Sequence, residues 1–286
     1  MDIDKKIVFF GFGNVGYKCL KYLLENDCNV IAVFTHNLDP HEQQWFDSTE
    51  ELAKEYYIDV FKPETLNTPK WIRKIKYMKP DLILSMFYRN RIPEEIFTQA
   101  TLGAYNMHGS YLPTYRGRAP LNWSIINGEN YCGATLHKME KSFDTGDIVS
   151  QKKVNILPEE YVADVEPRIA EAALECFKES LPSLLDGNPS LTPQDESKAS
   201  YYKKRTPEDG IIDFNKTARE VFNLIRALSK PFPGAFFDAE GTRATIWKAH
   251  IGNPIENGIE AGTIVCANPL TIACKDNYIV VDEFSS

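Results

Sequence analysis

The sequence predicts an α/β fold: a Rossmann-like parallel sheet flanked by helices, with a smaller, mostly-β, OB-like domain at the C-terminal end. The first observation is a strand–turn–helix–strand unit, which combines apolar runs at residues 6–10 and 30–34 with a glycine-containing turn and a helical pattern between them. Such a unit favours parallel strands joined by a right-handed crossover. The second observation is a series of short apolar runs separated by turns beyond residue 200, which is typical of a small, partly open barrel.

Hydrophobic periodicity and turn residues predict the other elements of the larger domain. Residues 48–57 are expected to form a helix, for which Asp47 or Ser48 is a suitable N-cap. Residues 80–85 contain a continuous apolar stretch, which indicates a strand that is buried on both faces. Further helices are expected at residues 69–78, 93–100 and 120–126, and further strands at residues 103–108, 134–139 and 148–156.

A change in composition marks the expected domain boundary. A long amphipathic helix is expected over residues 165–185, with an interruption near Pro182. Residues 186–200 are rich in Asp, Asn, Pro, Ser and Lys, which is typical of a linker. The expected division is into a large α/β domain, a linker and a small β-rich domain, at residues 1–188, 189–203 and 204–286. Strands of the last part are expected at residues 211–214, 235–237, 244–247, 262–265, 270–273 and 278–281, and a helix at residues 218–228.

Charge and composition exclude several classes of function. The chain of 286 residues has a net charge of −8, which argues against a broad basic surface for nucleic acid. No apolar run reaches the roughly 18–20 residues of a membrane helix, and the mixed-charge N-terminus does not resemble a secretion signal, so we expect a cytoplasmic protein. The six cysteines are scattered and show no spacing of a metal site, so no metal is expected.

A glycine motif near the N-terminus suggests one alternative function. Gly11, Gly13 and Gly16 follow a strand and open a helix, which is the context of a dinucleotide-binding turn and would suit an NAD(P)-dependent oxidoreductase. That motif also requires an acidic residue near the end of the second strand. Here the strand continues into Thr-His-Asn at residues 35–37, and the first acid, Asp39, comes too late. We favour the interpretation that the glycines allow a tight turn and close helix–strand packing.

A second group of residues points to chemistry at the sheet edge. Asn106 and His108 lie two positions apart at the end of a predicted strand, so their side chains share one face. In open α/β sheets, ligands bind at the carboxyl ends of the strands. Each of these residues also has a simple structural interpretation when it is considered alone. His108 could be a hydrogen-bonded structural histidine, Asn106 could belong to a turn or a helix cap, and Asp144, just before Gly146, could form a turn. Only their combination indicates a catalytic site.

The motifs around these residues resemble the folate-dependent formyltransferase family, and in particular its sugar N-formyltransferases. The resemblance covers most of the chain and makes residues 1–188 the catalytic domain. The residues that carry it are Asn106-Met-His108, the loop up to Arg116-Gly-Arg118-Ala-Pro, Gly133-Ala-Thr-Leu-His, Asp144-Thr-Gly-Asp-Ile-Val, Phe34-Thr-His, Ser85-Met-Phe-Tyr-Arg89, Arg205-Thr-Pro and Pro231-Phe-Pro-Gly-Ala-Phe.

The resemblance implies a role for each catalytic candidate. Asn106 would stabilise the oxyanion that forms when an amine attacks the formyl carbon, and His108 would carry the proton. Asp144 would favour the protonated form of this histidine. The cosubstrate would be N10-formyltetrahydrofolate. The residues implied to line its site are Asn90, Arg91, Ile92, Arg118, Glu140, Lys141, Ser142 and Phe143.

The resemblance also implies a nucleotide-linked amino sugar as the acceptor. The candidates are UDP- or dTDP-linked 4-amino-4-deoxy sugars, such as UDP-4-amino-4-deoxy-L-arabinose or dTDP-4-amino-4,6-dideoxyglucose, for lipopolysaccharide or O-antigen synthesis. Arg116 and Arg205 are expected to meet the diphosphate, and a homodimer is expected through the second domain. Methionyl-tRNA formyltransferase is the first alternative, although a tRNA substrate would favour a basic surface. The oxidoreductase and a non-catalytic binding protein on the same scaffold are further alternatives.

Overall fold

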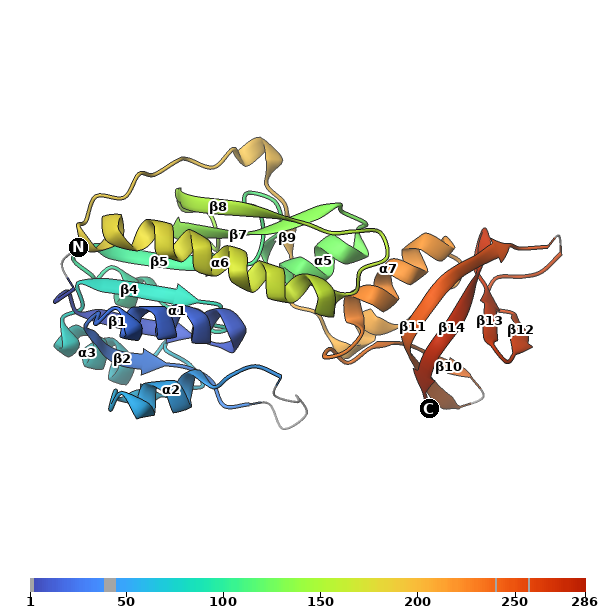
Figure 1. Cartoon of the computed structure of the whole chain (residues 1–286), viewed down its shortest axis with the longest axis horizontal. Helices are drawn as coiled ribbons and strands as arrows, with labels where there is room; N and C mark the ends of the chain where they lie inside the picture. The colour runs from blue at the N-terminus through green and yellow to red at the C-terminus, as the bar shows by residue number, and fades with distance from the viewer. Residues whose placement is uncertain (1–2, 39–44, 240, 257) are drawn as a thin grey trace. The chain divides into compact units, whose positions relative to one another are not determined.

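The structure, a computed structural model, describes residues 3–38, 45–239, 241–256 and 258–286 (Figure 1). Its internal contacts divide the chain into two compact units, each made of three segments. The first unit comprises Met1–Gly117, Gly133–Val154 and Pro167–Tyr201, and the second comprises Arg118–Cys132, Asn155–Glu166 and Tyr202–Ser286. The chain therefore enters the second unit twice before residue 188, which differs from the contiguous division expected at residues 1–188, 189–203 and 204–286. Neither early segment has a compositional break at its ends, so composition could not separate it.

The first unit is built on a seven-stranded sheet with the order β3-β2-β1-β4-β5-β7-β8. The strands are β1 (Ile7–Gly11), β2 (Val30–Phe34), β3 (Val60–Phe61), β4 (Leu82–Met86), β5 (Gly103–His108), β7 (Tyr131–Lys138) and β8 (Ile148–Asn155). Strands β1 to β5 pair in parallel, as the sequence predicts. Strand β7 pairs antiparallel with β5, so the sheet is mixed. Periodicity identifies a strand but does not specify its direction.

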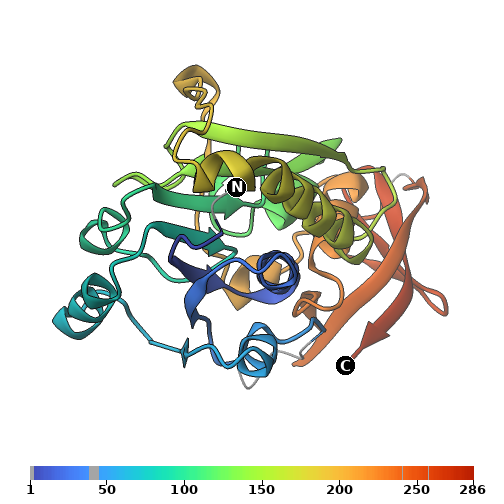
Figure 2. The same cartoon turned by 60° about the vertical axis from the view of Figure 1, so that its left-hand side comes forward.

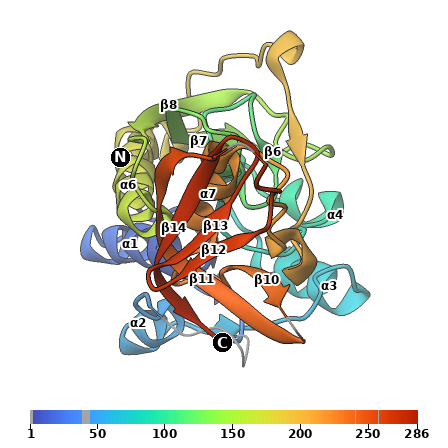
Figure 3. The same cartoon turned by 90° about the vertical axis from the view of Figure 1, so that its right-hand side faces the viewer.

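Helices cover both faces of this sheet. They are α1 (Gly13–Glu25), α2 (Thr49–Glu55), α3 (Pro69–Met78), α4 (Glu94–Phe97) and α6 (Val162–Leu185). Helices α1 and α6 lie on one face, and α3 and α4 lie on the other (Figures 2 and 3). Of the two predicted caps for α2, the structure uses Ser48, whose hydroxyl accepts a hydrogen bond from the Glu51 N–H at 3.2 Å. Helix α3 begins at Pro69, a position where the missing N–H costs nothing.

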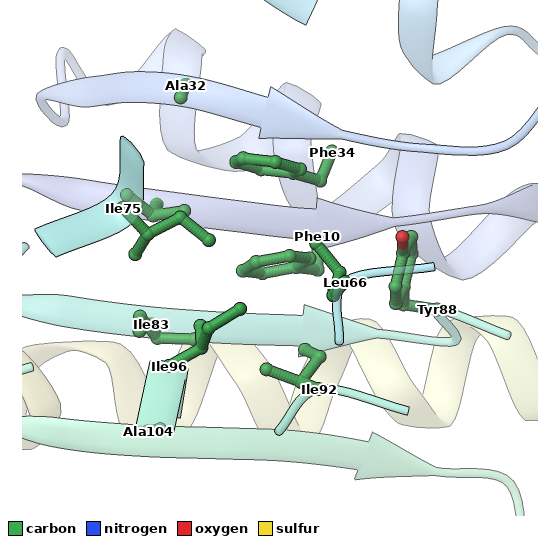
Figure 4. Packing of buried hydrophobic residues seen from close by; sticks show 11 residues of the cluster. Phe10, Ala32, Phe34, Leu66, Ile75, Ile83, Tyr88, Ile92, Ile96 and Ala104 are labelled. Carbon is green, nitrogen blue, oxygen red and sulfur yellow. The ribbon is translucent and has the colours of Figure 1, made fainter. Parts of the chain in front are cut away.

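Alternate residues of the strands form a core beneath α3 and α4. Phe10, Phe34 and Ile83 point to this face, as the two-residue period of a strand requires (Figure 4). The rings of Phe10 and Phe34 stack with their centroids 4.6 Å apart. Ile75 of α3 and Ile96 of α4 close the cluster from the helical side and are fully buried. This packing fixes the sheet whose strand ends carry the candidate site.

Helix α6 corrects one expectation about proline. It runs without a break from Val162 to Leu185, although an interruption near Pro182 was expected. The Asp186 N–H still donates to the Pro182 carbonyl at 3.0 Å, so the last turn closes normally. Leu181 and Leu184 on either side of Pro182 are fully buried, and their burial compensates for the hydrogen bond that proline cannot make. No helix in the described part of the chain is long and apolar enough to span a membrane.

The second unit has a five-stranded antiparallel sheet with the order β10-β11-β14-β13-β12. Figure 3 shows these strands with helix α7 (Ala218–Leu228) packed behind them. The strands are β10 (Ala235–Ala239), β11 (Thr242–Pro254), β12 (Ile264–Ala267), β13 (Leu270–Ala273) and β14 (Asn277–Ser285), and α5 (Pro120–Ile126) also belongs to this unit. The mostly-β prediction is confirmed, with a half-barrel as its form. Residues 211–214, predicted as a strand, contribute only an isolated bridge from Ile211 to Phe236.

Candidate active site

Strand β5 brings two of the three predicted catalytic residues to the carboxyl end of the parallel strands. Asn106 and His108 both lie on this strand, and His108 is buried with 7% of its surface exposed. Strand β4 lies on one side of β5, where Ser85 is the register partner of Asn106. Strand β7 lies on the other side, where His137 is the register partner of Asn106. The site is therefore assembled from three adjacent strands.

The Asn106 amide is oriented from both sides. The Ser85 hydroxyl donates to Asn106 Oδ1 at 2.7 Å. The other end, Nδ2, lies 3.2 Å from His137 Nε2. The amide nitrogen carries two hydrogens, and one of them can be donated to His137 only while His137 Nε2 carries no proton. The second can donate to a bound group at the strand end.

The two histidines of the site each have one nitrogen tied to a backbone carbonyl. His108 Nε2 lies 2.8 Å from the Tyr115 carbonyl oxygen, and His137 Nδ1 lies 2.8 Å from that of Lys138. A carbonyl oxygen only accepts hydrogen bonds, so both of these nitrogens carry a proton. The opposite nitrogens face Asp144: His108 Nδ1 is 3.6 Å from Oδ2, and His137 Nε2 is 3.4 Å from Oδ1.

Asp144 is held as a carboxylate between these imidazoles. Burial by itself raises the pKa of this carboxyl group, but the charge of His108, the hydrogen bond and charge of His137, and the Gly117 N–H hold the pKa well below its ordinary value. The Gly117 N–H donates to Oδ2 at 2.9 Å. The structure thus brings Asn106, His108 and Asp144 together, as the sequence analysis expects. It adds His137 as a group that contacts both Asn106 and Asp144.

The loops expected to line the folate site are joined to each other by Arg91. Its Nη2 donates to the Lys141 carbonyl at 3.5 Å, and its guanidinium lies 5.2 Å from the centroid of the exposed Phe143 ring. The Asn90 side chain donates to the Glu64 carbonyl at 2.9 Å. The side chain of Ile92 is part of the core, so only its backbone can face a ligand (Figure 4). Glu140, Lys141 and Ser142 are exposed.

Arg116 has a different role from the one expected. It is fully buried, and its guanidinium donates to both carboxylate oxygens of Glu196, at 2.6 and 2.9 Å, and to the Tyr201 hydroxyl at 2.6 Å. Its Nε and Nη2 donate to Gln194 Oε1 at 3.2 and 2.7 Å. Every donor nitrogen has a protein partner, so the expected contact with a diphosphate is not compatible with this arrangement. The segment that supplies these partners is the predicted linker, which is therefore a packed part of the first unit.

The other two predicted arginines belong to the second unit. Arg118 is exposed, and its backbone N–H donates to the Tyr202 carbonyl at 3.0 Å. Arg205 is half-buried, with its guanidinium 4.9 Å from the Trp123 ring centroid and its Nη2 donating to the Asp209 carbonyl at 2.7 Å. Burial lowers the pKa of the Arg205 guanidinium. The assignments of Arg118 to the folate site and of Arg205 to the diphosphate of the acceptor stay predictions.

The glycine turn after β1 is explained by packing. A Cβ on Gly16 would lie 2.8 Å from the Gly11 carbonyl carbon and 3.3 Å from the Met86 carbonyl oxygen, so α1 could not approach the sheet this closely with any other residue. At the end of β2, where a dinucleotide site needs an acid, His36 stacks on the Tyr88 ring, with the centroids 4.2 Å apart. Asp39 lies outside the described residues. Among the described residues, no group of three or more His, Cys, Asp or Glu side chains is arranged to hold a metal ion.

Residues 5–181 match the protein family described as Formyl transferase. The chain belongs to the formyl transferase family. Residues 204–286 match the family described as Formyl transferase, C-terminal domain.

Three solved structures share the fold of this formyl transferase chain. An N-formyltransferase from Helicobacter canadensis, in complex with folinic acid and dTDP-3-aminofucose, is 21% identical over 97% of this chain and 99% of its own, with a TM-score of 0.73. HypX from Aquifex aeolicus, in complex with tetrahydrofolic acid, is 20% identical over 98% of this chain, with a TM-score of 0.66, but this chain spans only 44% of HypX. Methionyl-tRNA formyltransferase from Clostridium thermocellum is 20% identical over 99% of both chains, with a TM-score of 0.62.

Three site residues of this formyl transferase chain were missed from sequence. Ser85 and His137 each belong to a motif of the family resemblance, but the sequence predicts no role for either. Their contact with Asn106 depends on which strands are neighbours. The alternation of residues 134–139 would have placed Thr135 and His137 on one face, which is the only sequence signal for His137. Gln194 lies in the predicted linker, and nothing in its sequence context indicates that it reaches the Asp144 turn.

Proposed function

We propose that this chain is an N-formyltransferase that moves the formyl group of N10-formyltetrahydrofolate to the amine of a nucleotide-linked 4-amino-4-deoxy sugar. The observation that carries the proposal is the convergence of the Asn106 amide, the His108 imidazole and the Asp144 carboxylate at the end of β5. These are a donor for an oxyanion, a group that can carry a proton, and a fixed negative charge beside it. An acyl-type transfer between two nitrogens needs all three.

The reaction forms one carbon–nitrogen bond and breaks another. The amine nitrogen attacks the formyl carbon, and negative charge develops on the formyl oxygen. The second N–H of the Asn106 amide, whose Oδ1 accepts from Ser85, donates to that oxygen. Loss of one well-aimed donor of this kind typically costs about 3–4 kcal/mol of transition-state stabilisation. The attacking nitrogen then loses a proton, and N10 of the folate gains one as it departs.

His108 carries this proton, and Asp144 supports it. In the free protein His108 Nε2 carries the proton that it donates to the Tyr115 carbonyl. To take a proton from the reacting amine, Nε2 must leave this carbonyl and the proton of the neutral imidazole must lie on Nδ1, which faces Asp144. The Asp144 carboxylate remains ionised at neutral pH because its pKa is held low, and it stabilises the imidazolium that forms. His137 contributes a second positive or hydrogen-bonding partner to the same carboxylate.

Residues of the two loops beside Asp144 suit a flat, amide-bearing cosubstrate. Phe143 is 56% exposed, and Arg91 lies against it and against the Lys141 carbonyl, so the two loops present an aromatic face and backbone groups together. Folate supplies the formyl group, and these residues would hold its ring system. The Helicobacter structure contains folinic acid and the Aquifex structure contains tetrahydrofolic acid, which supports this assignment.

The choice of a sugar nucleotide as the acceptor rests on charge and on fold relatives. The net charge of −8 disfavours a tRNA. The Helicobacter relative was solved with a dTDP-linked amino sugar, which supports an acceptor of this class, although that sugar carries its amine at position 3. A formylated 4-amino sugar would serve a surface glycan such as O-antigen or lipopolysaccharide.

A panel assay tests the proposal. The chain is incubated with N10-formyltetrahydrofolate and, separately, with UDP- and dTDP-linked 4-amino sugars, a dTDP-linked 3-amino sugar and initiator methionyl-tRNA, and products are followed by mass spectrometry. We expect a mass increase of one formyl group on a 4-amino sugar nucleotide. Formylation of the tRNA alone would overturn the acceptor assignment. Formylation of none of them, together with tight NAD(P) binding seen by fluorescence, would overturn the reaction.

A further inference from the structure

The turn that carries Asp144 has an unusual backbone and an external support. Asp144 adopts a φ of 56°, in the left-handed region that a residue with a Cβ rarely occupies. Its own carbonyl and the carbonyl of Gly146 both accept hydrogen bonds from Gln194 Nε2, at 2.9 and 2.7 Å. Gln194 is 50 residues away in sequence from Asp144. One side chain thus fixes the backbone on both sides of the turn.

The orientation of the Gln194 amide is set by Arg116. Gln194 Oε1 accepts from Arg116 Nε and Nη2, at 3.2 and 2.7 Å. A guanidinium has only donors, so the amide oxygen must face Arg116 and the NH₂ group must face the turn. Glu196 holds Arg116 in a bidentate pair, and the Tyr201 hydroxyl takes a further donor. Arg116 is fully buried, whereas its partners Glu196 and Tyr201 are exposed.

The same segment also reaches the Asp144 carboxylate. Gly117, which follows Arg116, donates its N–H to Asp144 Oδ2 at 2.9 Å. Ser200 in turn holds this part of the loop, since its hydroxyl accepts from the Tyr115 N–H at 2.9 Å and its carbonyl accepts from the Arg116 N–H at 2.8 Å. The backbone and the carboxylate of Asp144 are therefore both positioned by one cluster around the buried Arg116, which comprises Arg116, Gln194, Glu196 and Tyr201.

We propose that this cluster around Arg116 positions Asp144, and that Gln194 is its central residue. The inference rests on the proposed role of Asp144 in formyl transfer. Gln194 touches neither reacting group and acts only through the turn. Its loss would let the carboxylate move away from His108, and a displacement of about 1 Å at such a site can lower turnover by about a hundredfold.

Gln194→Glu is the sharpest variant to test this inference. The side chain keeps its length and pairs more strongly with Arg116, but its carboxylate cannot donate to the carbonyls of Asp144 and Gly146. We expect a thermal unfolding midpoint close to that of the wild type. Turnover should fall about ten- to hundredfold while KM for both substrates changes less than about threefold, because only the turn is displaced. Gln194→Leu should show the same fall in turnover.

Two further measurements separate positioning from a general structural role. Hydrogen–deuterium exchange in residues 139–148 of the free protein should become faster in both Gln194 variants, and this readout needs no substrate. In an Asp144→Asn background, Gln194→Leu should cause no additional loss of turnover, because Gln194 acts through the carboxylate that is already absent. Gln99→Leu is the matched control, since it removes a glutamine side chain that donates to the Ile72 carbonyl elsewhere in the first unit.

These experiments test the positioning role of Gln194 whichever amine accepts the formyl group. Turnover is measured with whichever amine the panel assay identifies. Unchanged exchange in residues 139–148 overturns the positioning role even if the chain formylates no sugar nucleotide. An equal loss of turnover in the wild-type and Asp144→Asn backgrounds overturns the link to Asp144. Failure of the sugar panel alone overturns only the proposed acceptor.

Discussion

The neighbours of Asp144 decide whether its carboxyl group is ionised. As an isolated residue before a glycine it is an ordinary turn former, and burial alone would favour its neutral form. Two imidazoles and the Gly117 N–H reverse this preference and hold its pKa below the ordinary value. The carboxylate therefore stays charged at neutral pH.

Replacing His108 by alanine tests the proton carrier. We expect His108→Ala to lose most turnover, by about 10²–10⁴-fold, while folate affinity is retained, because the imidazole acts in the transition state and not in binding. Steady-state kinetics and folate titration by fluorescence would measure the two effects. His250→Ala is the control, since His250 pairs with Asp282 on an exposed surface of the second unit. Near wild-type turnover in His108→Ala would remove this residue from the mechanism.

Replacing Asp144 by asparagine tests the fixed charge. A carboxylate beside an imidazole favours the imidazolium. In Asp144→Asn this attraction is lost, and the acidic limb of the pH–turnover profile should move to lower pH. Asp282→Asn, which changes the His250 pair instead, should leave the limb in place. An unmoved limb in Asp144→Asn would mean that Asp144 is only a turn residue.

At the scale of elements, the ends of helices and strands follow local sequence closely. The bounds of α3, β5 and α7 are those expected from periodicity, and Ser48 caps α2. The differences arise where packing outweighs local preference. Helix α6 continues through Pro182 because its neighbours are buried, and residues 211–214 do not extend a ladder because only Ile211 reaches Phe236. The two-residue strands β3, β6 (Arg116–Gly117) and β9 (Tyr201–Tyr202) are too short to leave a periodic signal.

The contact between α1 and the sheet gives a prediction about the glycine motif. Gly16→Ala should lower the free energy of unfolding by about 1–3 kcal/mol, because the new Cβ would press on Gly11 and on the Met86 carbonyl. Urea denaturation measures this change. Gly13→Asn is the control, because nothing lies within 4 Å of a Cβ at that site and asparagine tolerates its φ of +65°. A neutral Gly16→Ala combined with tight NAD(P) binding would favour the dinucleotide interpretation instead.

At the scale of the whole molecule, net charge gives a test of the tRNA alternative. A chain with a charge of −8 repels a polyanion, so initiator tRNA should show no complex at about 150 mM salt in a gel-shift titration. A small basic protein serves as the positive control. A complex whose affinity falls steeply as salt is raised would show that a local basic surface overcomes the net charge, and would favour the methionyl-tRNA alternative.

The homodimer expected from the family resemblance stays a prediction at this scale. Sedimentation velocity over a tenfold range of concentration should give a species of twice the chain mass of 32.6 kDa. Bovine serum albumin run alongside calibrates the mass. A single species at the chain mass at every concentration would contradict the prediction.

The sequence by itself predicted most of the elements, the parallel core and, through the family resemblance, the catalytic candidates, because these depend on short-range patterns and motifs. Periods of two and 3.6 residues, capping residues and the Asn106–His108 spacing are all local properties. Tertiary structure alone decided that β7 runs antiparallel, that Ser85 and His137 flank Asn106, and that Arg116 is bound inside the protein by Gln194 and Glu196. These facts depend on which distant segments become neighbours, and no local pattern encodes that choice. The candidate residues could be named from the chain, but the groups that hold them could not.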